Sequence, residues 1–217
     1  MARRTKEEAL ATRAALLDAA EQLFQAHGVS GTSLQDIAAA AGATRGAVYW
    51  HFRDKADLFN AMMERVSMPL EDALVGAGAG DDQDAMQRMR QAILLALRRT
   101  ETDAQTRRVF EVATHKVEYV EALAPIRQRH LRVRHECLLQ MKQTLLATAR
   151  ARKLRLPVPA EAAARGLHAL VDGLIQNWLL DSSAFRLEAT GRQVMDRYLA
   201  GLGLDPAPAV ACASSDL

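Results

Sequence analysis

Seven residues between positions 44 and 51 have side chains suited to contact with a nucleic acid. They are Thr44, Arg45, Gly46, Ala47, Tyr49, Trp50 and His51. Arginine reads guanine through O6 and N7, while glycine and alanine let a helix approach the bases and let a methyl group touch thymine. The polar-tipped aromatic side chains suit phosphates and the rim of a groove. On one helix face this set would read the major groove of DNA, with Arg45 as the leading base-contacting residue.

Five further residues flank this set and are candidates for contact with phosphates. They are Arg3, Arg4, Lys6, Ser33 and Lys55. The three N-terminal residues are interpreted as a flexible basic arm that reaches the DNA backbone or the minor groove, and an ordinary solvated terminus is the alternative. Ser33 and Thr44 are expected at helix N-termini, where backbone N–H groups attract phosphate. Lys55 stands at the expected start of the following helix.

A helix-turn-helix over residues 32–55 would position these side chains. Ser33 stands three residues before Asp36, the spacing of a capping box that begins a helix. Gly42 supplies the turn, with alanines before it for the close approach of the two helices. Thr44 then caps the second helix. This second helix is the expected reading helix, and Phe52 at its end fits the core better than the DNA surface.

The rest of the chain is predicted to be helical as well. Ala, Leu, Arg, Glu and Gln dominate, and runs of β-branched residues are nearly absent, which favours helices. Apolar periodicity predicts about nine helices, over residues 7–27, 34–41, 45–52, a stretch from Asp54 past Val66 with Pro69 near its end, 84–100, 104–121, 125–152, 159–181 and 187–203. Residues 76–84 are interpreted as a flexible loop. The fold class is therefore all-α.

Composition excludes several classes of protein. A formal net charge of +2 is too small for a chain that coats nucleic acid along its length. The two cysteines, Cys137 and Cys212, form neither a disulfide framework nor a zinc pattern and suit the reducing cytosol. Acidic residues at Glu7 and Glu8 replace the apolar stretch of a signal peptide, and a membrane span needs ~20 apolar residues that the chain lacks. We expect a cytoplasmic protein with no membrane partner.

The block from Thr32 to Leu58 resembles the N-terminal domain of the TetR family of transcriptional repressors. The matching residues are Thr32, Ser33, Ile37, Ala38, Ala41, Gly42, Ala43, Thr44, Gly46, Tyr49, His51, Phe52, Lys55 and Leu58. The string TRGAVYWHF, with HKVEY at 115–119 and VDGLIQNWLL at 171–180, is similar to the AcrR/TtgR branch of that family. The likeness covers roughly residues 1–200. It implies a homodimeric repressor of a multidrug (RND-type) efflux operon, and of its own gene, released by a hydrophobic drug or phenolic effector.

The resemblance also implies a ligand-binding region in the helices behind the DNA-binding domain. Compared position by position, it nominates Met89, Ala92, Ile93, Ala96, Phe110, Thr114, Cys137, Met141, Val171, Asp172, Ile175 and Gln176, with Ser67 and Arg134 facing or rimming the pocket. The set is mostly apolar, as pockets for drug-sized molecules are. Asp172 would be costly to bury without a partner, so we expect it to pair with Arg, His or a ligand. Each nominated residue, taken alone, is better explained as core.

The last two predicted helices carry apolar residues on more than one side, which suits a dimer interface. The candidates are Leu167, Leu170, Leu174, Trp178, Val194, Tyr198 and Leu199. A two-fold dimer would place two reading helices ~34–36 Å apart on a palindrome. The periodicity permits this dimer and the resemblance implies it; a core helix wrapped on all sides is the alternative. The expected domains are a DNA-binding domain at 1–55, a ligand-binding and dimerisation domain at 56–204 and a disordered tail at 205–217.

Catalytic chemistry finds little support in the sequence. Glu111 and His115 share a helix face at i and i+4, but no third ligand stands at recognisable spacing. There is no phosphate-binding loop and no nucleophile elbow. We predict no enzymatic activity and no cofactor or metal. Two alternatives stay open: a regulator of the same fold that senses an acyl group, another metabolite or redox state, and a small helical enzyme that turns over substrate without binding DNA.

Overall fold

The fold consists of helices throughout the part of the chain that the structure describes. The computed structural model describes residues 2–77, 82–118 and 120–204, with side chains from residues 6–67, 85–118, 120–121 and 123–204. Within these ranges there are nine α-helices, one short 3-10 helix at Glu121–Leu123 and no strand. The helices are α1 (Ala2–His27), α2 (Leu34–Ala40), α3 (Arg45–His51), α4 (Lys55–Ala77), α5 (Asp82–Thr102), α6 (Ala104–His115), α7 (Ala124–Ala151), α8 (Ala160–Leu180) and α9 (Leu187–Gly201). The predicted all-α architecture of about nine helices is confirmed.

Three boundaries differ from those predicted. α1 begins at Ala2, because the polar N-terminal residues contain no glycine or proline to stop a helix. α6 ends at His115, where the chain turns and the Lys116 carbonyl accepts a hydrogen bond from the Val29 N–H at 3.0 Å. The predicted loop at 76–84 is shorter than expected, since α4 runs to Ala77 and α5 begins at Asp82; residues 78–81, and the tail at 205–217, lie outside the described residues.

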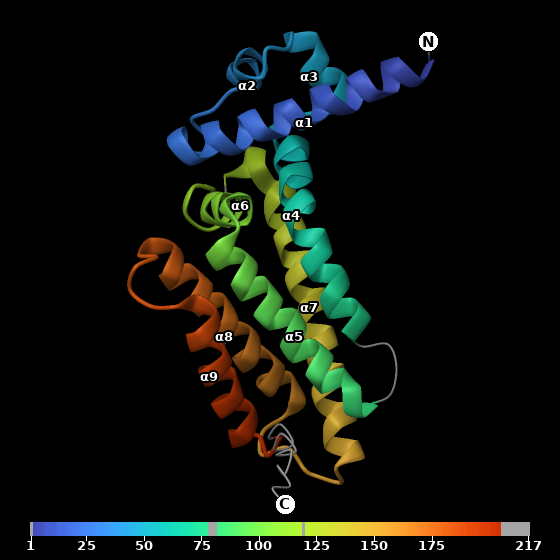
Figure 1. Cartoon of the computed structure of the whole chain (residues 1–217), viewed down its shortest axis with the longest axis vertical. Coiled ribbons are helices and arrows are strands. Elements are labelled where there is room, and N and C mark those ends of the chain that lie inside the picture. Colours follow the sequence, from blue (N-terminus) through green and yellow to red (C-terminus); the bar gives the residue numbers. More distant parts are fainter. Residues whose placement is uncertain (1, 78–81, 119, 205–217) are drawn as a thin grey trace, which may run out of the picture.

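The helices form a long body with a small cap at one end (Figure 1). α1 lies across that end, with α2 and α3 on its outer side. α4, α5 and α7 run along the body, and α8 and α9 pack beside them. α6 contacts α1 on one side and α5 and α8 on the other, so it links the cap to the body. None of the helices in the described ranges is long and apolar enough to cross a membrane.

Two apolar cores hold this arrangement. The first contains fully buried residues of α1, α2 and α3 together with α4, α6 and the start of α7; Phe24, Ile37 and Val48 are examples. The second joins α5, α7, α8 and α9, with Leu145 and Leu199 at its centre. Each such side chain contributes about 1.5–3 kcal/mol by burial. The first core extends well beyond residue 55, so the cap is built on the same apolar cluster as α4 and α6.

Candidate DNA interface and effector region

The turn between α2 and α3 is shaped by two caps and one glycine. Ser33 Oγ accepts a hydrogen bond from the Asp36 N–H at 3.1 Å, and the Asp36 carboxylate accepts one from the Ser33 N–H at 2.9 Å, forming the predicted capping box. Hydrogen bonds from the Ser33 side chain and backbone hold the pKa of Asp36 below its ordinary value. Gly42 has φ of +63°, a conformation that L side chains rarely adopt. Thr44 Oγ1 accepts from the Ala47 N–H at 3.2 Å, as predicted.

One face of α3 points away from the protein. The exposed residues are Arg45, Gly46, Tyr49 and Trp50, at helix spacings i, i+1, i+4 and i+5. Such spacings place them on one side of the helix. Val48 and Phe52 are buried on the other side, where the sequence predicts core. The indole of Trp50 is 73% exposed, so this face is free to contact another molecule.

Aromatic contacts order the exposed face. The guanidinium carbon of Arg45 lies 5.7 Å from the centroid of the Tyr49 ring, a cation–π distance that aligns Arg45 along the helix. The rings of Trp50 and His51 meet edge to face at 4.5 Å. Burial lowers the pKa of His51, and the positive charge of Arg13 on α1 lowers it further. Both effects favour the neutral form of the His51 imidazole, which offers a hydrogen-bonding ring.

Lys55, a predicted phosphate contact, makes hydrogen bonds within the protein. Its Nζ donates to the carbonyl oxygens of Val29 at 2.7 Å, Thr32 at 2.8 Å and Ser30 at 3.2 Å. An ammonium group has three N–H donors, so all of them are used. Burial lowers the pKa of Lys55, and the negative charge of Glu118 opposes this. Lys55 therefore fastens the loop between α1 and α2 to the start of α4.

The flexible basic arm is also corrected. The backbone is helical from Ala2 onward, so these residues form the first turns of α1 and their positions are set by that helix. Lys6 is exposed there. The side chains of Arg3 and Arg4 lie outside the described residues.

A buried carboxylate, missed by the sequence analysis, joins α1 to α4 and α6. Glu21 is 1% exposed; Arg65 of α4 donates to its Oε1, and Gln105 Nε2 of α6 donates to the same oxygen at 3.1 Å. Arg108 Nη1 of α6 lies 3.7 Å from Oε2. The signal available in the sequence was a glutamate on the apolar stripe of α1, three residues before Phe24, where a charge needs a partner.

Two more contacts tie α6 to the cap. Gln25 Nε2 of α1 donates to Glu111 Oε2 of α6 at 2.8 Å. The Val29 N–H, in the loop that leads to α2, donates to the carbonyl of Lys116 just after α6. Glu111 is thus engaged with Gln25, and among the described residues no group of three His, Cys, Asp or Glu side chains could hold a metal ion. A shift of α6 would be felt directly by α1 and α2.

Both halves of the chain match known families. Residues 16–62 match the family described as bacterial regulatory proteins, tetR family, and residues 84–203 match the C-terminal region of MAATS-type transcriptional repressors. The chain belongs to the TetR family. It is 37% identical over 207 residues to the HTH-type transcriptional regulator TtgR of Pseudomonas putida, covering 95% of this chain and 99% of TtgR. The family match over residues 16–62 includes α2 and α3, the two helices of the predicted helix-turn-helix.

Solved structures of TetR-family repressors share the fold. NalD, described as the secondary repressor of the MexAB-OprM multidrug efflux pump in Pseudomonas aeruginosa, is 34% identical with a TM-score of 0.79, covering 89% of this chain and 98% of NalD. A complex of SmeT with triclosan is 30% identical with a TM-score of 0.78, covering 92% of this chain and 99% of SmeT. SmeT is described as the repressor of the Stenotrophomonas maltophilia pump SmeDEF.

The nominated ligand residues fall into three groups in this TetR-family fold. Buried side chains are Ser67, Met89, Ala92, Ile93 and Met141. Half-buried ones are Ala96, Phe110, Thr114, Cys137, Val171 and Ile175, and exposed ones are Arg134, Asp172 and Gln176. Met89, Ile93 and Met141 belong to the packed second core. In this conformation they fill space instead of lining an opening.

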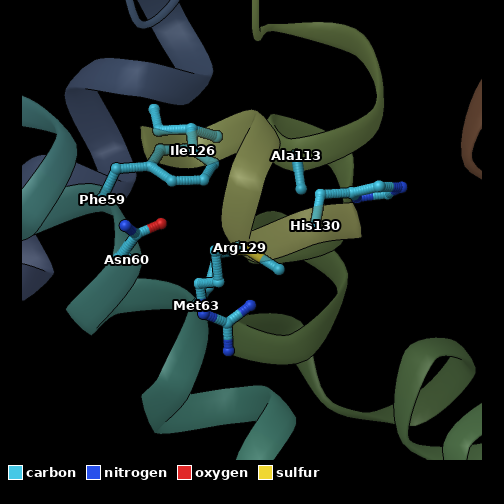
Figure 2. Close-up of a pocket in the computed structure, with 7 residues that line it drawn as sticks. All are labelled: Phe59, Asn60, Met63, Ala113, Ile126, Arg129 and His130. Atoms are coloured by element: carbon cyan, nitrogen blue, oxygen red, sulfur yellow. The ribbon is translucent and has the colours of Figure 1, made fainter. Parts of the chain in front are cut away.

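A small hollow lies between α4, α6 and α7 (Figure 2). It has a volume of about 20 Å³, enough for about one water molecule, and is lined by Phe59, Asn60 and Met63 of α4, Ala113 of α6, and Ile126, Arg129 and His130 of α7. None of the nominated residues lines it. The two sets adjoin where Arg129 Nη2 donates to Ser67 Oγ at 2.8 Å. The Oδ1 atom of Asn60 is buried and accepts no hydrogen bond among the described residues.

Asp172 finds partners on its own helix and near the α7–α8 contact. Its Oδ2 accepts a hydrogen bond from Gln176 Nε2 at 2.7 Å, and the residue is exposed instead of buried. Burial lowers the pKa of His168 on α8 and of His130 on α7, and the negative charge of Asp172 opposes both shifts. Arg134 adds to the lowering at both histidines. These four residues form one electrostatic cluster between α7 and α8.

The expected dimer residues divide into core and surface. Leu167, Trp178 and Leu199 are buried in the second core of their own protomer, so the structure corrects their expected place on the interface. The Trp178 Nε1 donates to the Phe185 carbonyl at 3.1 Å, and the Arg107 guanidinium of α6 lies 4.9 Å from its ring. Leu170, Leu174 and Tyr198 are half-buried and Val194 is exposed. The sequence analysis missed Leu180, which is 72% exposed at the end of α8.

Proposed function

We propose that this protein is an effector-released repressor of a multidrug efflux operon and of its own gene. The observation that carries the proposal is the outward face of α3, where the Arg45 donors and an exposed Trp50 stand on a helix capped by Thr44. Bidentate pairing of one arginine with guanine supplies ~1–3 kcal/mol of discrimination. TtgR, NalD and SmeT, which this chain resembles over nearly its whole length, support control of an efflux operon.

We propose that the protein acts as a homodimer, because one short reading helix contacts too few base pairs to recognise an operator specifically. Its interface is formed by the surface residues of α8 and α9, Leu170, Leu174, Leu180, Val194 and Tyr198. A two-fold axis through this surface would present two α3 helices to one palindromic operator.

This interface is tested by sedimentation of Val194→Asp. Val194 and Leu131 of α7 are both 38% exposed, so Leu131→Asp is a matched control outside the proposed interface. We expect the first variant to be monomeric and the control to remain dimeric. Equal masses for both variants would contradict the interface.

The effector is proposed to bind where the α4–α6–α7 hollow adjoins the nominated residues, and the hollow must widen to admit it, because its volume of about 20 Å³ holds about one water molecule. The hollow has apolar walls from Phe59, Met63 and Ile126, and Asn60 Oδ1 is a buried acceptor for a hydroxyl or amide of the effector. A ligand shifts the conformation only if it binds one state more tightly than the other. Because α6 is bound to α1 through Glu21, displacement of α6 by an effector would turn the reading helix out of register with the groove.

The decisive experiment is fluorescence anisotropy on labelled DNA taken from upstream of the protein's own gene. We expect binding that is at least 10³-fold tighter than to scrambled DNA at the same salt concentration. Triclosan, the ligand of the SmeT complex, and a panel of phenolics and antibiotics are then added. Release by one of these supports efflux control; release only by an acyl-CoA would favour a metabolite sensor. Equal affinity for scrambled DNA would contradict a specific repressor.

A further inference from the structure

The end of the molecule farthest from α1 carries a groove that the proposed function does not use. It lies where α7 ends and the chain turns toward α8, close to the end of α9 (Figure 1). It holds about 1150 Å³, including space open to solvent. The lining residues are Leu146, Ala149, Arg150, Leu154, Arg155, Leu156, Pro157, Val158, Pro159 and Ala160. Leu154 and Val158 are 45% and 41% exposed, so apolar side chains are left in contact with water in a concave surface.

The backbone holds this groove open. Lys153 adopts φ of +54° just after α7, the only non-glycine residue with positive φ among those described. The Leu154 N–H donates to the Ala149 carbonyl at 2.8 Å, which closes the turn. A left-handed residue other than glycine is uncommon and persists when its surroundings stabilise it. The apolar residues after the turn are thereby presented on the surface by a defined backbone.

The rim of the groove is strongly basic. Residues 150–155 include Arg150, Arg152, Lys153 and Arg155, and the sequence has no acidic residue from position 137 to position 160. Arg150 and Arg155 line the groove and form no ion pair with another residue of the described ranges. An occupant that is apolar along its length and carries negative charge would complement both the walls and the rim.

The chain itself supplies such a segment next to the groove. Residues 205–217, DPAPAVACASSDL, contain Asp205 and Asp216, no basic residue, and an apolar run of Pro, Ala, Val and Cys between them. Leu204, which immediately precedes this segment, is fully buried in the second core, the core that includes the groove residue Ala149. Leu156, another groove residue, packs against the same core. The segment therefore begins beside the groove.

We propose that residues 205–217 dock into this groove of their own chain. The 13-residue segment can extend at most ~45 Å, ample for a site that adjoins its starting point. Such a short tether gives an effective concentration in the mM range, so an intrinsic Kd of ~1 mM suffices for substantial occupancy. Pro206 and Pro208 restrict the backbone and reduce the entropy lost on docking. A separate acidic partner would have to displace the tethered segment.

Disulfide trapping tests the proposal in the full-length chain. Cys212 is the reporter, Cys137→Ser removes the other thiol, and Val158→Cys places a thiol in the groove. A disulfide needs Cα atoms within ~7 Å, and docking would hold the two thiols there more often than random collisions of the tether do. Ala151→Cys is the matched control, because Ala151 is exposed at the same end of α7 but does not line the groove. We expect oxidation within one chain to be at least tenfold faster for position 158 than for position 151.

Charge reversal supplies the second measurement. Arg150→Glu with Arg155→Glu, added to the Val158→Cys chain, should slow the trapping at least fivefold at low salt, and high salt should slow it in the parent. Equal trapping rates at positions 158 and 151 would overturn the proposal. Disulfides formed mainly between two chains would overturn it in favour of a second copy as occupant. Neither measurement requires operator binding or an effector, so this result stands apart from that of the anisotropy experiment.

Discussion

The DNA-binding end and the α8–α9 end of the protomer each have an apolar core, but their polar contacts differ in burial. At the first, Glu21, which is 1% exposed, joins α1 to α4 and α6, and Lys55 donates to three carbonyls. At the second, the polar contacts include ion pairs made by exposed arginines, Arg98 with Glu188 and Arg186 with Glu101. A buried polar contact is held in one geometry, whereas an exposed ion pair contributes at most about 1 kcal/mol.

This difference suits the two tasks of a regulator. A reading helix must keep its orientation relative to the DNA groove. The polar contacts of α1 with α6 would transmit a rotation of α6 to the DNA-binding helices. The α8–α9 surface needs to tolerate a partner and small sliding movements, and exposed ion pairs such as Arg98–Glu188 can rearrange at little cost in free energy. Substitutions at either end test this difference.

The largest effect is expected from Glu21→Ala. It leaves Arg65 without its buried partner, and removing one member of a buried ion pair costs about 3–5 kcal/mol of unfolding free energy. Denaturant unfolding monitored by circular dichroism measures this loss. Operator affinity should fall as well, because α1 loses its buried polar link to α4 and α6.

Asp18→Ala is the control for that experiment. Asp18 binds the same Arg65, at 2.8 Å, but its side chain is 59% exposed. An exposed ion pair contributes at most about 1 kcal/mol. If the two variants lost equal stability, the cap would not depend on the buried carboxylate, and the contrast between the two ends would fail.

Arg45→Ala sharpens the contrast from the DNA side. Operator affinity should drop by about 1–3 kcal/mol while thermal unfolding is unchanged, because Arg45 is exposed and, among the described residues, packs on the Tyr49 ring of its own helix. Arg53→Ala is the control, since Arg53 follows α3 and is 85% exposed. Arg53→Ala should lower the affinity for operator DNA and for non-specific DNA by the same factor. Anisotropy on operator and scrambled DNA distinguishes the two patterns.

Gly42→Ala tests the turn between α2 and α3. An added Cβ would meet nothing within 4 Å, so the whole cost is the left-handed backbone, about 1–2 kcal/mol. The melting temperature should fall by several degrees. Gly201→Ala at the end of α9 also meets nothing within 4 Å but has no positive φ, and it should leave the melting temperature unchanged or slightly raised. A fall of the same size in both would show that the turn imposes no special conformation.

The sequence predicted most of what depends on near neighbours along the chain. The capping box at Ser33, the cap at Thr44, the turn at Gly42 and the buried Phe52 are all properties of a few consecutive residues. Helix number and type follow from periodicity for the same reason. The outward face of α3 was thereby found before the fold was known.

Contacts between distant segments could not be predicted in this way. Lys55 meets the carbonyl of Val29, 26 positions earlier, and Gln105 meets Glu21 across 84 positions. Trp178 lies on an apolar stripe that suits either a core or an interface, and only the packing of α6 and Phe185 against it decides for the core. The sequence pattern does not show which charged residues meet in the folded protein.

The smallest expected effect is on the pH dependence of stability, and it arises between α7 and α8. Burial lowers the pKa of His168 and His130 below the ordinary 6.5, against the opposing charge of Asp172, with Arg134 adding to the lowering. Between the lowered pKa and 6.5 the unfolded chain binds protons that the folded chain does not, so stability falls as pH drops below about 6.5 and recovers above it. The melting temperature measured from pH 5 to 7.5 should show this slope, and His168→Asn should flatten it.

His115→Asn, at the exposed end of α6, tests whether loss of any histidine has the same effect. Burial also lowers the pKa of His51 at the DNA-binding end, so a slope that His51→Asn removes entirely would place the sensitivity in the cap instead of between α7 and α8.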